Sequence, residues 1–177
     1  MRKRNSSVAL MKSAIDAAKD VALHDLTQKQ KSTLTVVGID PGQSTGVAVY
    51  LAGKLVSLQT LAPDQLEAWL EQNRPGVVFF EDSRKTSKTF TAGKVRSVAA
   101  ALKIARNVGE IDRLCKDIEA MCQRLGIECY GVTPAGKGSK VDAKAFAQIT
   151  GWADRSNQHA RDAAMVAWPY RNKASKA

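Results

Sequence analysis

The 177-residue sequence has the composition of a folded globular protein of about one domain, with 44% hydrophobic and 25% charged residues. Its 27 Lys and Arg residues outnumber its 17 Asp and Glu residues, which gives a net charge of +10. A balance this basic favours an anionic partner, most often nucleic acid. No apolar run reaches the roughly 18–20 residues that a membrane span needs, so we expect no membrane association.

Residues 1–32 are predicted to be a basic N-terminal extension that carries one amphipathic helix, because apolar residues recur at helical spacing between Val8 and Ala22. The segment begins with basic residues like a signal peptide, but it lacks the continuous apolar core of one, and its three aspartates argue against a transit sequence. We therefore expect a cytoplasmic protein. Its cysteines, which are predicted to be reduced thiols that pack as small apolar residues, agree with that compartment: Cys115, Cys122 and Cys129.

The pattern changes to strands at residue 33, where we place the start of a single α/β domain over residues 33–177. Residues 34–40 form a continuous apolar run, as expected of a strand covered on both faces. Tight turns connect this run to a strand over 46–51 and, after a hairpin turn at 52–54, to a third strand that continues to about residue 61. Strands joined by such short turns are antiparallel neighbours, so the first three strands are predicted to form a meander.

A helix over 63–73 is predicted next, opened by Pro63, and a second short apolar run over 77–82 follows it. The right-handed crossover through this helix makes the 77–82 strand parallel to the first strand. The remaining elements are a long helix over 94–125, a strand over 127–133, and helices near 140–150 and 157–168. The sequence thus predicts a five-stranded mixed sheet flanked by helices.

Two strands that are expected to be parallel neighbours end on acids. Asp40 ends the first strand, and Glu81, followed by Asp82, ends the fourth. Ligands of such sheets gather at the carboxyl ends of the parallel strands, so we expect these acids to meet at one edge. Carboxylates held together repel each other unless a cation lies between them, and Mg²⁺ prefers such oxygen ligands. Alone, a strand-ending Asp such as Asp40 is more often a structural residue, and Glu81-Asp82 is equally compatible with an ordinary solvated strand end.

The last predicted helix contributes two more candidate ligands. His159 and Asp162 are three residues apart, so they share one helical face. Alanines around them are small enough to let this helix lie close to the sheet. His159 alone is also compatible with a surface or capping histidine. The combination with Asp40 and Glu81 predicts a metal site.

A one-sided basic segment lies after the fourth strand. From Ser83 to Arg106 there are seven basic residues and no acid. A solvated helix face normally mixes both signs, so this segment favours contact with phosphates.

Three motifs carry a resemblance to a known family. The stretches "GIDPGQSTGVAV", "FFED" and "HARDAAMVA", in this order and with this order of strands and helices, resemble RuvC-type Holliday-junction resolvases of the ribonuclease H-like superfamily. The likeness covers about residues 33–169, and "TGW" at 150–152 with the compact C-terminus looks more like the bacteriophage branch. It implies a ribonuclease H-like fold and a role in DNA recombination or repair in a bacterial or phage-infected cell.

The resemblance implies a role for each residue that matches the family's motifs. Asp40 matches the first catalytic acid, Glu81 the second, with Asp82 as a less favoured substitute, and Asp162 the fourth. His159 stands where many relatives carry a third acid. The implied cofactor is Mg²⁺, with two ions per site. An imidazole prefers transition metals more than a carboxylate does, so Mn²⁺ is expected to substitute for Mg²⁺ and to support activity better.

The resemblance also makes DNA the expected phosphate partner. Lys140 resembles a basic residue of the family's catalytic face, and Phe90 is the candidate for an aromatic base contact. The residues expected to contact DNA are Arg84, Lys85, Lys88, Phe90, Lys94, Arg96 and Lys137.

The implied reaction is the symmetric hydrolysis of a four-way DNA junction. Two metal ions about 4 Å apart would be bridged by Asp40, and the products would carry a 5′-phosphate and a 3′-hydroxyl. Two symmetric nicks call for a homodimer, with the 94–125 helix as the candidate interface. Three alternatives stay open: a related nuclease that cuts other branched DNA or RNA–DNA hybrids, an actin-like phosphotransferase, for which the chain is short, and a catalytically silent junction binder.

Overall fold

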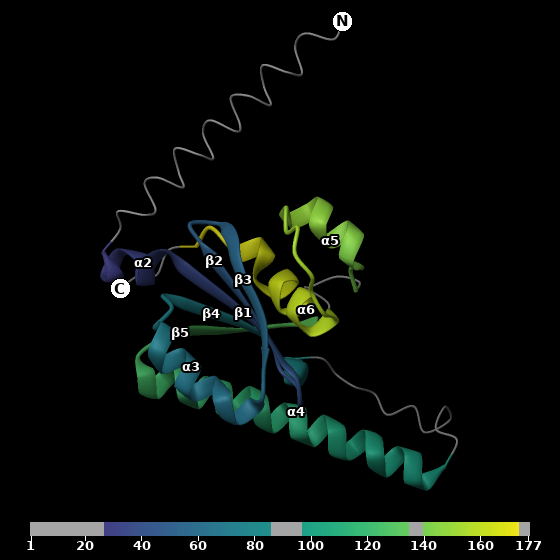
Figure 1. The fold of residues 1–177 in the computed structure, drawn as a ribbon. Coiled ribbons are helices and arrows are strands. Elements are labelled where there is room, and N and C mark those ends of the chain that lie inside the picture. Colours follow the sequence, from purple (N-terminus) through teal and green to yellow (C-terminus); the bar gives the residue numbers. More distant parts are fainter. Residues whose placement is uncertain (1–26, 86–96, 135–139, 174–177) are drawn as a thin grey trace, which may run out of the picture.

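The computed structural model describes residues 27–85, 97–134 and 140–173 (Figure 1). Its strands are β1 (Thr35–Asp40), β2 (Thr45–Leu51), β3 (Lys54–Leu61), β4 (Val77–Glu81) and β5 (Glu128–Val132). Its α-helices are α2 (Gln28–Leu34), α3 (Leu66–Asn73), α4 (Val98–Leu125), α5 (Ala143–Thr150) and α6 (Gln158–Ala167). Short 3-10 helices span Pro63–Gln65, Ser83–Lys85 and Trp168–Tyr170. The amphipathic helix predicted between residues 8 and 22 lies outside the described residues.

The strands form one mixed sheet in the order β3-β2-β1-β4-β5. β1 pairs antiparallel with β2 and β2 with β3, whereas β1 pairs parallel with β4 and β4 with β5. The predicted meander, the crossover and the mixed five-stranded sheet are confirmed. Because Ile39 pairs with Phe80, the residues that follow them, Asp40 and Glu81, lie at the same edge of the sheet.

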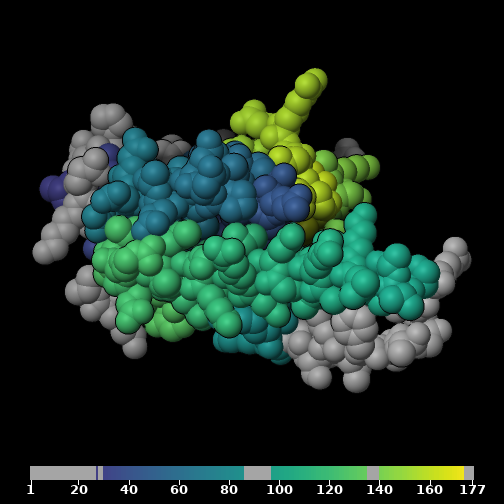
Figure 2. All heavy atoms as spheres, turned by 90° about the horizontal axis from the view of Figure 1, so that it is seen from below, coloured from purple at the N-terminus to yellow at the C-terminus, as the bar shows by residue number. Residues whose placement is uncertain are grey.

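Helices cover both faces of the sheet. Residues of β1 alternate between two cores: Val36 packs with α6 and with Phe146 of α5, and Val37 packs with residues of α3 and α4. In Figure 1, α5 and α6 lie on one side of the strands, and α3 and α4 lie on the other. Figure 2 shows α3 and α4 side by side on their face. The double coverage explains why β1 reads as a continuous apolar run rather than an alternating one.

The long helix α4 has two different halves. Its C-terminal half buries Cys115, Ile118 and Cys122 against the sheet, so the predicted apolar packing of these two cysteines is confirmed. Its N-terminal half runs past the sheet (Figure 1), and Val98 is 78% exposed there, with Leu102 also exposed. None of the described helices is long and apolar enough to cross a membrane.

The helix α2 was not predicted. Its start is fixed by a capping box in which the Gln30 backbone N–H donates to Thr27 Oγ1 at 3.3 Å and the Thr27 backbone N–H donates to Gln30 Oε1 at 2.9 Å. The hydroxyl of Ser32 donates to the Arg74 carbonyl oxygen at 2.6 Å, which holds the helix against the end of α3. The apolar run suggested a strand from residue 34, but Leu34 belongs to α2 and the strand begins at Thr35.

Candidate active site

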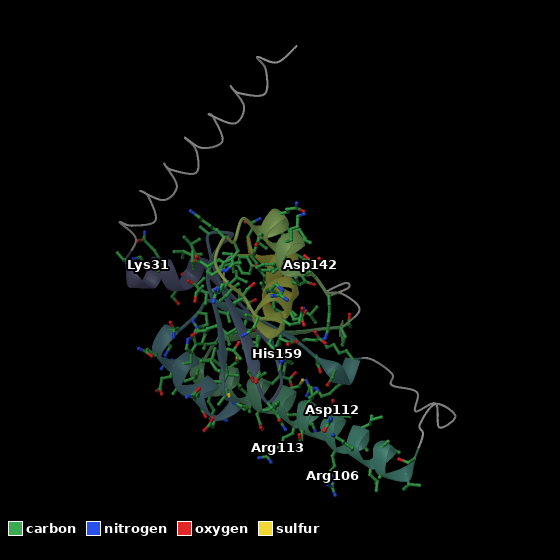
Figure 3. All side chains as sticks on the ribbon, turned by 45° about the vertical axis from the view of Figure 1, so that its right-hand side comes forward. Lys31, Arg106, Asp112, Arg113, Asp142 and His159 are labelled. Atoms are coloured by element: carbon green, nitrogen blue, oxygen red, sulfur yellow. The ribbon has the colours of Figure 1, made fainter. Side chains whose placement is uncertain are left out.

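Asp40 and His159 meet at the carboxyl edge of the sheet. Asp40 ends β1, and its Oδ2 atom lies 3.1 Å from Nδ1 of His159, which is on the first turn of α6. The Asp40 side chain is 13% exposed, whereas that of His159 is 52% exposed. Figure 3 shows His159 at this edge of the sheet. The first turn of α6 thus lies against the strand-end acid Asp40, and the metal-binding role of the two residues stays a prediction.

The contact depends on an unusually close approach of α6 to the sheet. A Cβ atom at Gly46 would lie 2.0 Å from the carbonyl oxygen of His159, and one at Gly38 would lie 2.1 Å from that of Ala163. Both distances are far below van der Waals contact, so only glycine fits at these two strand positions. The buried alanines of α6 complete a backbone-to-backbone contact that presents the helix face to Asp40.

The start of α6 is fixed by Asn157. Its side-chain oxygen accepts a hydrogen bond from the Ala160 backbone N–H at 2.9 Å, which caps the helix. Its side-chain nitrogen donates to Thr60 Oγ1 on β3 at 2.7 Å. One residue therefore both begins the helix and connects it to the sheet.

Asp162 lies one turn after His159 and is buried, with 4% of the residue exposed. Its Oδ1 atom accepts a hydrogen bond from Nε2 of Gln158 at 2.9 Å. A buried carboxylate needs such partners, because leaving it without hydrogen bonds would be costly.

Glu81 ends β4 beside the end of β1. One oxygen of its carboxylate, Oε2, is fully buried, and its backbone carbonyl accepts a hydrogen bond from Sγ of Cys115 at 3.5 Å. Parallel pairing of β1 and β4 brings Glu81 and Asp40 to one edge, as predicted.

The Asp82 carboxylate forms an ion pair with Arg84. Arg84 donates to Oδ1 of Asp82 from Nε at 2.7 Å and to Oδ2 from Nη2 at 2.9 Å. The same Nη2 atom donates to Oε1 of Glu119 on α4 at 2.7 Å. These hydrogen bonds from the Arg84 side chain lower the pKa of Asp82. This ion pair was not predicted, although the run "EDSR" places an acid and an arginine two residues apart.

The predicted DNA-contacting residues are only partly described. Arg84 makes the ion pairs above, and Lys85 donates from Nζ to the Gly131 carbonyl oxygen at 2.8 Å. Lys140 is exposed just before α5. Five of the expected DNA contacts lie outside the described residues: Lys88, Phe90, Lys94, Arg96 and Lys137. The DNA-binding roles of all these residues stay predictions.

Asp40, Glu81, Asp162 and His159 have the oxygen and nitrogen donors that Mg²⁺ and Mn²⁺ accept, and of these side chains Asp40 and His159 are shown in contact. Adjacent ligands of an octahedral ion with bonds of about 2.1 Å lie roughly 3 Å apart. The 3.1 Å between Asp40 Oδ2 and His159 Nδ1 is equally an ordinary hydrogen-bond distance, so it does not by itself indicate a metal. Within the described ranges, no three His, Cys, Asp or Glu side chains form a group that could hold a metal ion.

Comparison with known proteins identifies the fold. No protein-family model matches the sequence, and no curated protein matches it. Among solved structures, the chain is similar to T. thermophilus RuvC in complex with a Holliday junction substrate, with a TM-score of 0.52 and 18% identity over 76% of this chain and 90% of that chain. A further Thermus thermophilus RuvC structure gives a TM-score of 0.52 and 15% identity over 80% and 98% of the two chains.

The sheet order and its flanking helices define a ribonuclease H-like α/β fold. More specifically, the chain has the fold of RuvC-type resolvases, as the sequence motifs predicted. At this level of identity the likeness concerns the fold, and the bacteriophage branch stays a prediction.

Proposed function

We propose that this protein is a metal-dependent endonuclease that resolves four-way DNA junctions by symmetric phosphodiester hydrolysis. One observation carries the proposal: a strand-end carboxylate, Asp40, contacts His159 of α6 at 3.1 Å on a RuvC-type fold. Glu81 ends β4, which pairs parallel with β1, and Asp162 lies one turn after His159 on α6. A fold alone does not define a function, so the proposal depends on this combination of side chains.

The proposed ligands of the metal are Asp40, Glu81, His159 and Asp162. Two Mg²⁺ or Mn²⁺ ions, when bound, would supply an activated water and would stabilise the leaving oxygen. The protein's part is to hold the ligands in place. Asp40 is fixed by a strand buried on both faces, and Asp162 by burial and the hydrogen bond from Gln158. Lys140, exposed before α5, is proposed to neutralise charge on the scissile phosphate.

The proposed partner is branched DNA, and the proposed assembly is a homodimer. The net charge of +10 suits a polyanion. Two coordinated nicks need two active sites, which a two-fold dimer provides. The N-terminal half of α4 supports this assembly, because it exposes the apolar side chains of Val98, Leu102 and Ile104.

The test uses an immobile synthetic four-way junction labelled in turn on each strand, with Mg²⁺ or Mn²⁺ present. We expect paired nicks at symmetric positions, which disappear with a chelator. We also expect Asp40→Asn to abolish cleavage while junction binding is kept, because the substitution removes a charge from the metal site and leaves the basic surface unchanged.

Other outcomes would change the proposal in defined ways. Binding of the junction without nicks by the wild-type protein would favour a silent junction binder. Preferential cutting of flaps or RNA–DNA hybrids would keep the metal site and replace the substrate. Cleavage by Asp40→Asn at the wild-type rate would show that the site is assigned to the wrong residues.

A further inference from the structure

A chain of side-chain hydrogen bonds on α6 leads to Asp162. Arg161 donates from Nη2 to Oε1 of Gln158 at 2.8 Å, and Gln158 donates from Nε2 to Oδ1 of Asp162 at 2.9 Å. Gln158 and Asp162 are four residues apart on the same helix, so their side chains are neighbours on its surface. Gln158 is half-buried and Asp162 is buried.

The order of donors and acceptors fixes the orientation of the Gln158 amide. A guanidinium group has five N–H donors and no acceptor, so only the carbonyl oxygen of the amide can face Arg161. The amide NH₂ group must then face Asp162, whose ionised carboxylate can only accept. A rotated amide would place its NH₂ group against the guanidinium and its oxygen against the carboxylate, and both hydrogen bonds would be lost.

Arg161 is itself held by backbone groups. Its Nε atom donates to the Val141 carbonyl oxygen at 3.1 Å, and its Nη1 atom donates to the Ser156 carbonyl oxygen at 2.6 Å and to Ser156 Oγ at 3.3 Å. These acceptors belong to the segments that precede α5 and α6. Arg161 is therefore held by several hydrogen bonds, one of which fixes the backbone next to Lys140.

We propose that Gln158 is a positioning residue for Asp162 and that Arg161 sets the orientation of the Gln158 amide. The inference rests on the proposed function, in which Asp162 is a metal ligand. Residues that hydrogen-bond to a metal ligand hold its orientation, and their loss typically weakens metal binding by about 10–100-fold. Gln158 touches neither the metal nor the DNA in this scheme, and it acts through Asp162 alone.

The test replaces Gln158 in the full-length protein with Met, which has a similar length and no N–H donor. We expect Gln158→Met to weaken Mn²⁺ binding to the DNA-free protein by about tenfold in a calorimetric titration. The Mn²⁺ concentration for half-maximal junction cleavage should rise by a similar factor. The melting temperature without metal and the affinity for the junction without metal should stay close to those of the wild type.

Two further variants sharpen the test. Gln158→Asn keeps the amide but is too short to contact Arg161 and Asp162 at once, so it should weaken Mn²⁺ binding as Met does. Gln148→Met makes the same chemical change at an exposed position of α5 and should leave Mn²⁺ binding unchanged. If Gln158→Met and Gln158→Asn both bind Mn²⁺ as the wild type does, the positioning role is overturned.

The Mn²⁺ titration separates this inference from the proposed function. A wild-type protein that binds Mn²⁺ but leaves junctions uncut would overturn the function and still allow the role of Gln158 to be measured. Wild-type cleavage together with unchanged Mn²⁺ binding by both Gln158 variants would overturn the inference alone. A wild-type protein that binds no Mn²⁺ would overturn both.

Discussion

Arg84 holds both carboxylate oxygens of Asp82, at 2.7 and 2.9 Å, immediately after the strand-end acid Glu81. The same guanidinium reaches Glu119 on α4 at 2.7 Å. Next to this pair, the hydroxyl of Ser83 donates to Oδ1 of Asp112, also on α4, at 2.5 Å. The end of β4 is thus connected to α4 by side chains that directly follow Glu81.

Removing the charge of Asp82 should destabilise the protein. Asp82→Asn leaves the partly exposed Arg84 guanidinium, which still reaches Glu119, beside a neutral amide, and the loss of this charged partner should cost about 1–3 kcal/mol. Urea unfolding of the metal-free protein at neutral pH measures this loss. Asp117→Asn is the control, because Asp117 pairs at 3.6 Å with a well-exposed Arg113 and such surface pairs contribute little. Equal losses for the two variants would contradict a structural role for the buried pair.

The same ion pair predicts a pH dependence of stability. Hydrogen bonds from Arg84 lower the pKa of Asp82 in the folded protein below its unfolded value of about 4. The stabilisation is therefore fully present above that unfolded value and is lost as the pH falls through the lower folded value. The free energy of unfolding should decrease across this acidic range in the wild type. In Asp82→Asn the decrease should be smaller, because this variant has no carboxylate to protonate at position 82.

A methyl group at Gly46 should displace α6 from the candidate site. The added Cβ would lie 2.0 Å from the His159 carbonyl oxygen, so the start of the helix must move away from β2. We expect Gly46→Ala to cost about 1–3 kcal/mol of stability and to reduce junction cleavage strongly, since His159 shifts with the backbone. Thermal unfolding and the cleavage assay measure the two effects.

Gly109→Ala is the matched control for this substitution. Gly109 lies in the exposed part of α4, and a Cβ there meets nothing within 4 Å. Alanine should stabilise the helix by about 0.5–1 kcal/mol and leave cleavage unchanged. A Gly46→Ala protein with wild-type stability and cleavage would show that the close approach of α6 is not needed.

Most of the fold could be predicted from the sequence because its elements have strong local patterns. The double-sided burial of β1, the tight turns around β2 and the long apolar period of α4 each leave a clear trace. The right-handed crossover rule then made β4 parallel to β1. The helix α2 was missed because its signal, a capping box between Thr27 and Gln30, is short and stands beside a much stronger apolar run.

The candidate site was less predictable at the level of contacts. Asp40, Glu81 and Asp162 could be named because strand ends and a motif mark them. The contact between Asp40 and His159 joins residues 119 positions apart, so no local pattern in the sequence could predict it. The same holds for the close approach at Gly46 and for the hydrogen bond between Arg84 and Glu119, which depend on how separate elements pack.

The imidazole of His159 should influence which metal supports cleavage. Nitrogen ligands favour transition metals such as Mn²⁺, whereas carboxylates suit Mg²⁺. We expect His159→Asp to lower the ratio of the cleavage rate with Mn²⁺ to that with Mg²⁺ by several-fold. Cleavage rates at saturating concentrations of each metal give this ratio. An unchanged ratio, with both rates preserved, would remove His159 from the ligand set.

The exposed half of α4 offers a test of the proposed DNA surface. Arg106 and Arg113 are seven residues apart on α4, and both extend away from the sheet (Figure 3). Arg113 is 83% exposed and lies 3.6 Å from Asp117, which offsets its charge. Arg106 is the last residue of the basic segment 83–106, which contains no acid. Glu110 lies four residues after Arg106 as Asp117 does after Arg113, but within the described residues of α4 it is Arg113 and Asp117 that form an ion pair at this spacing.

A contact between Arg106 and a phosphate should appear in the salt dependence of junction binding. Each phosphate that a protein neutralises adds about 0.9 to the slope of log affinity against log salt concentration, because a counterion is released. We expect Arg106→Ala to reduce the slope by about that amount. Arg113→Ala should change it much less, since Asp117 already compensates that charge. Equal slopes for the wild type and both variants would exclude Arg106 from the DNA interface.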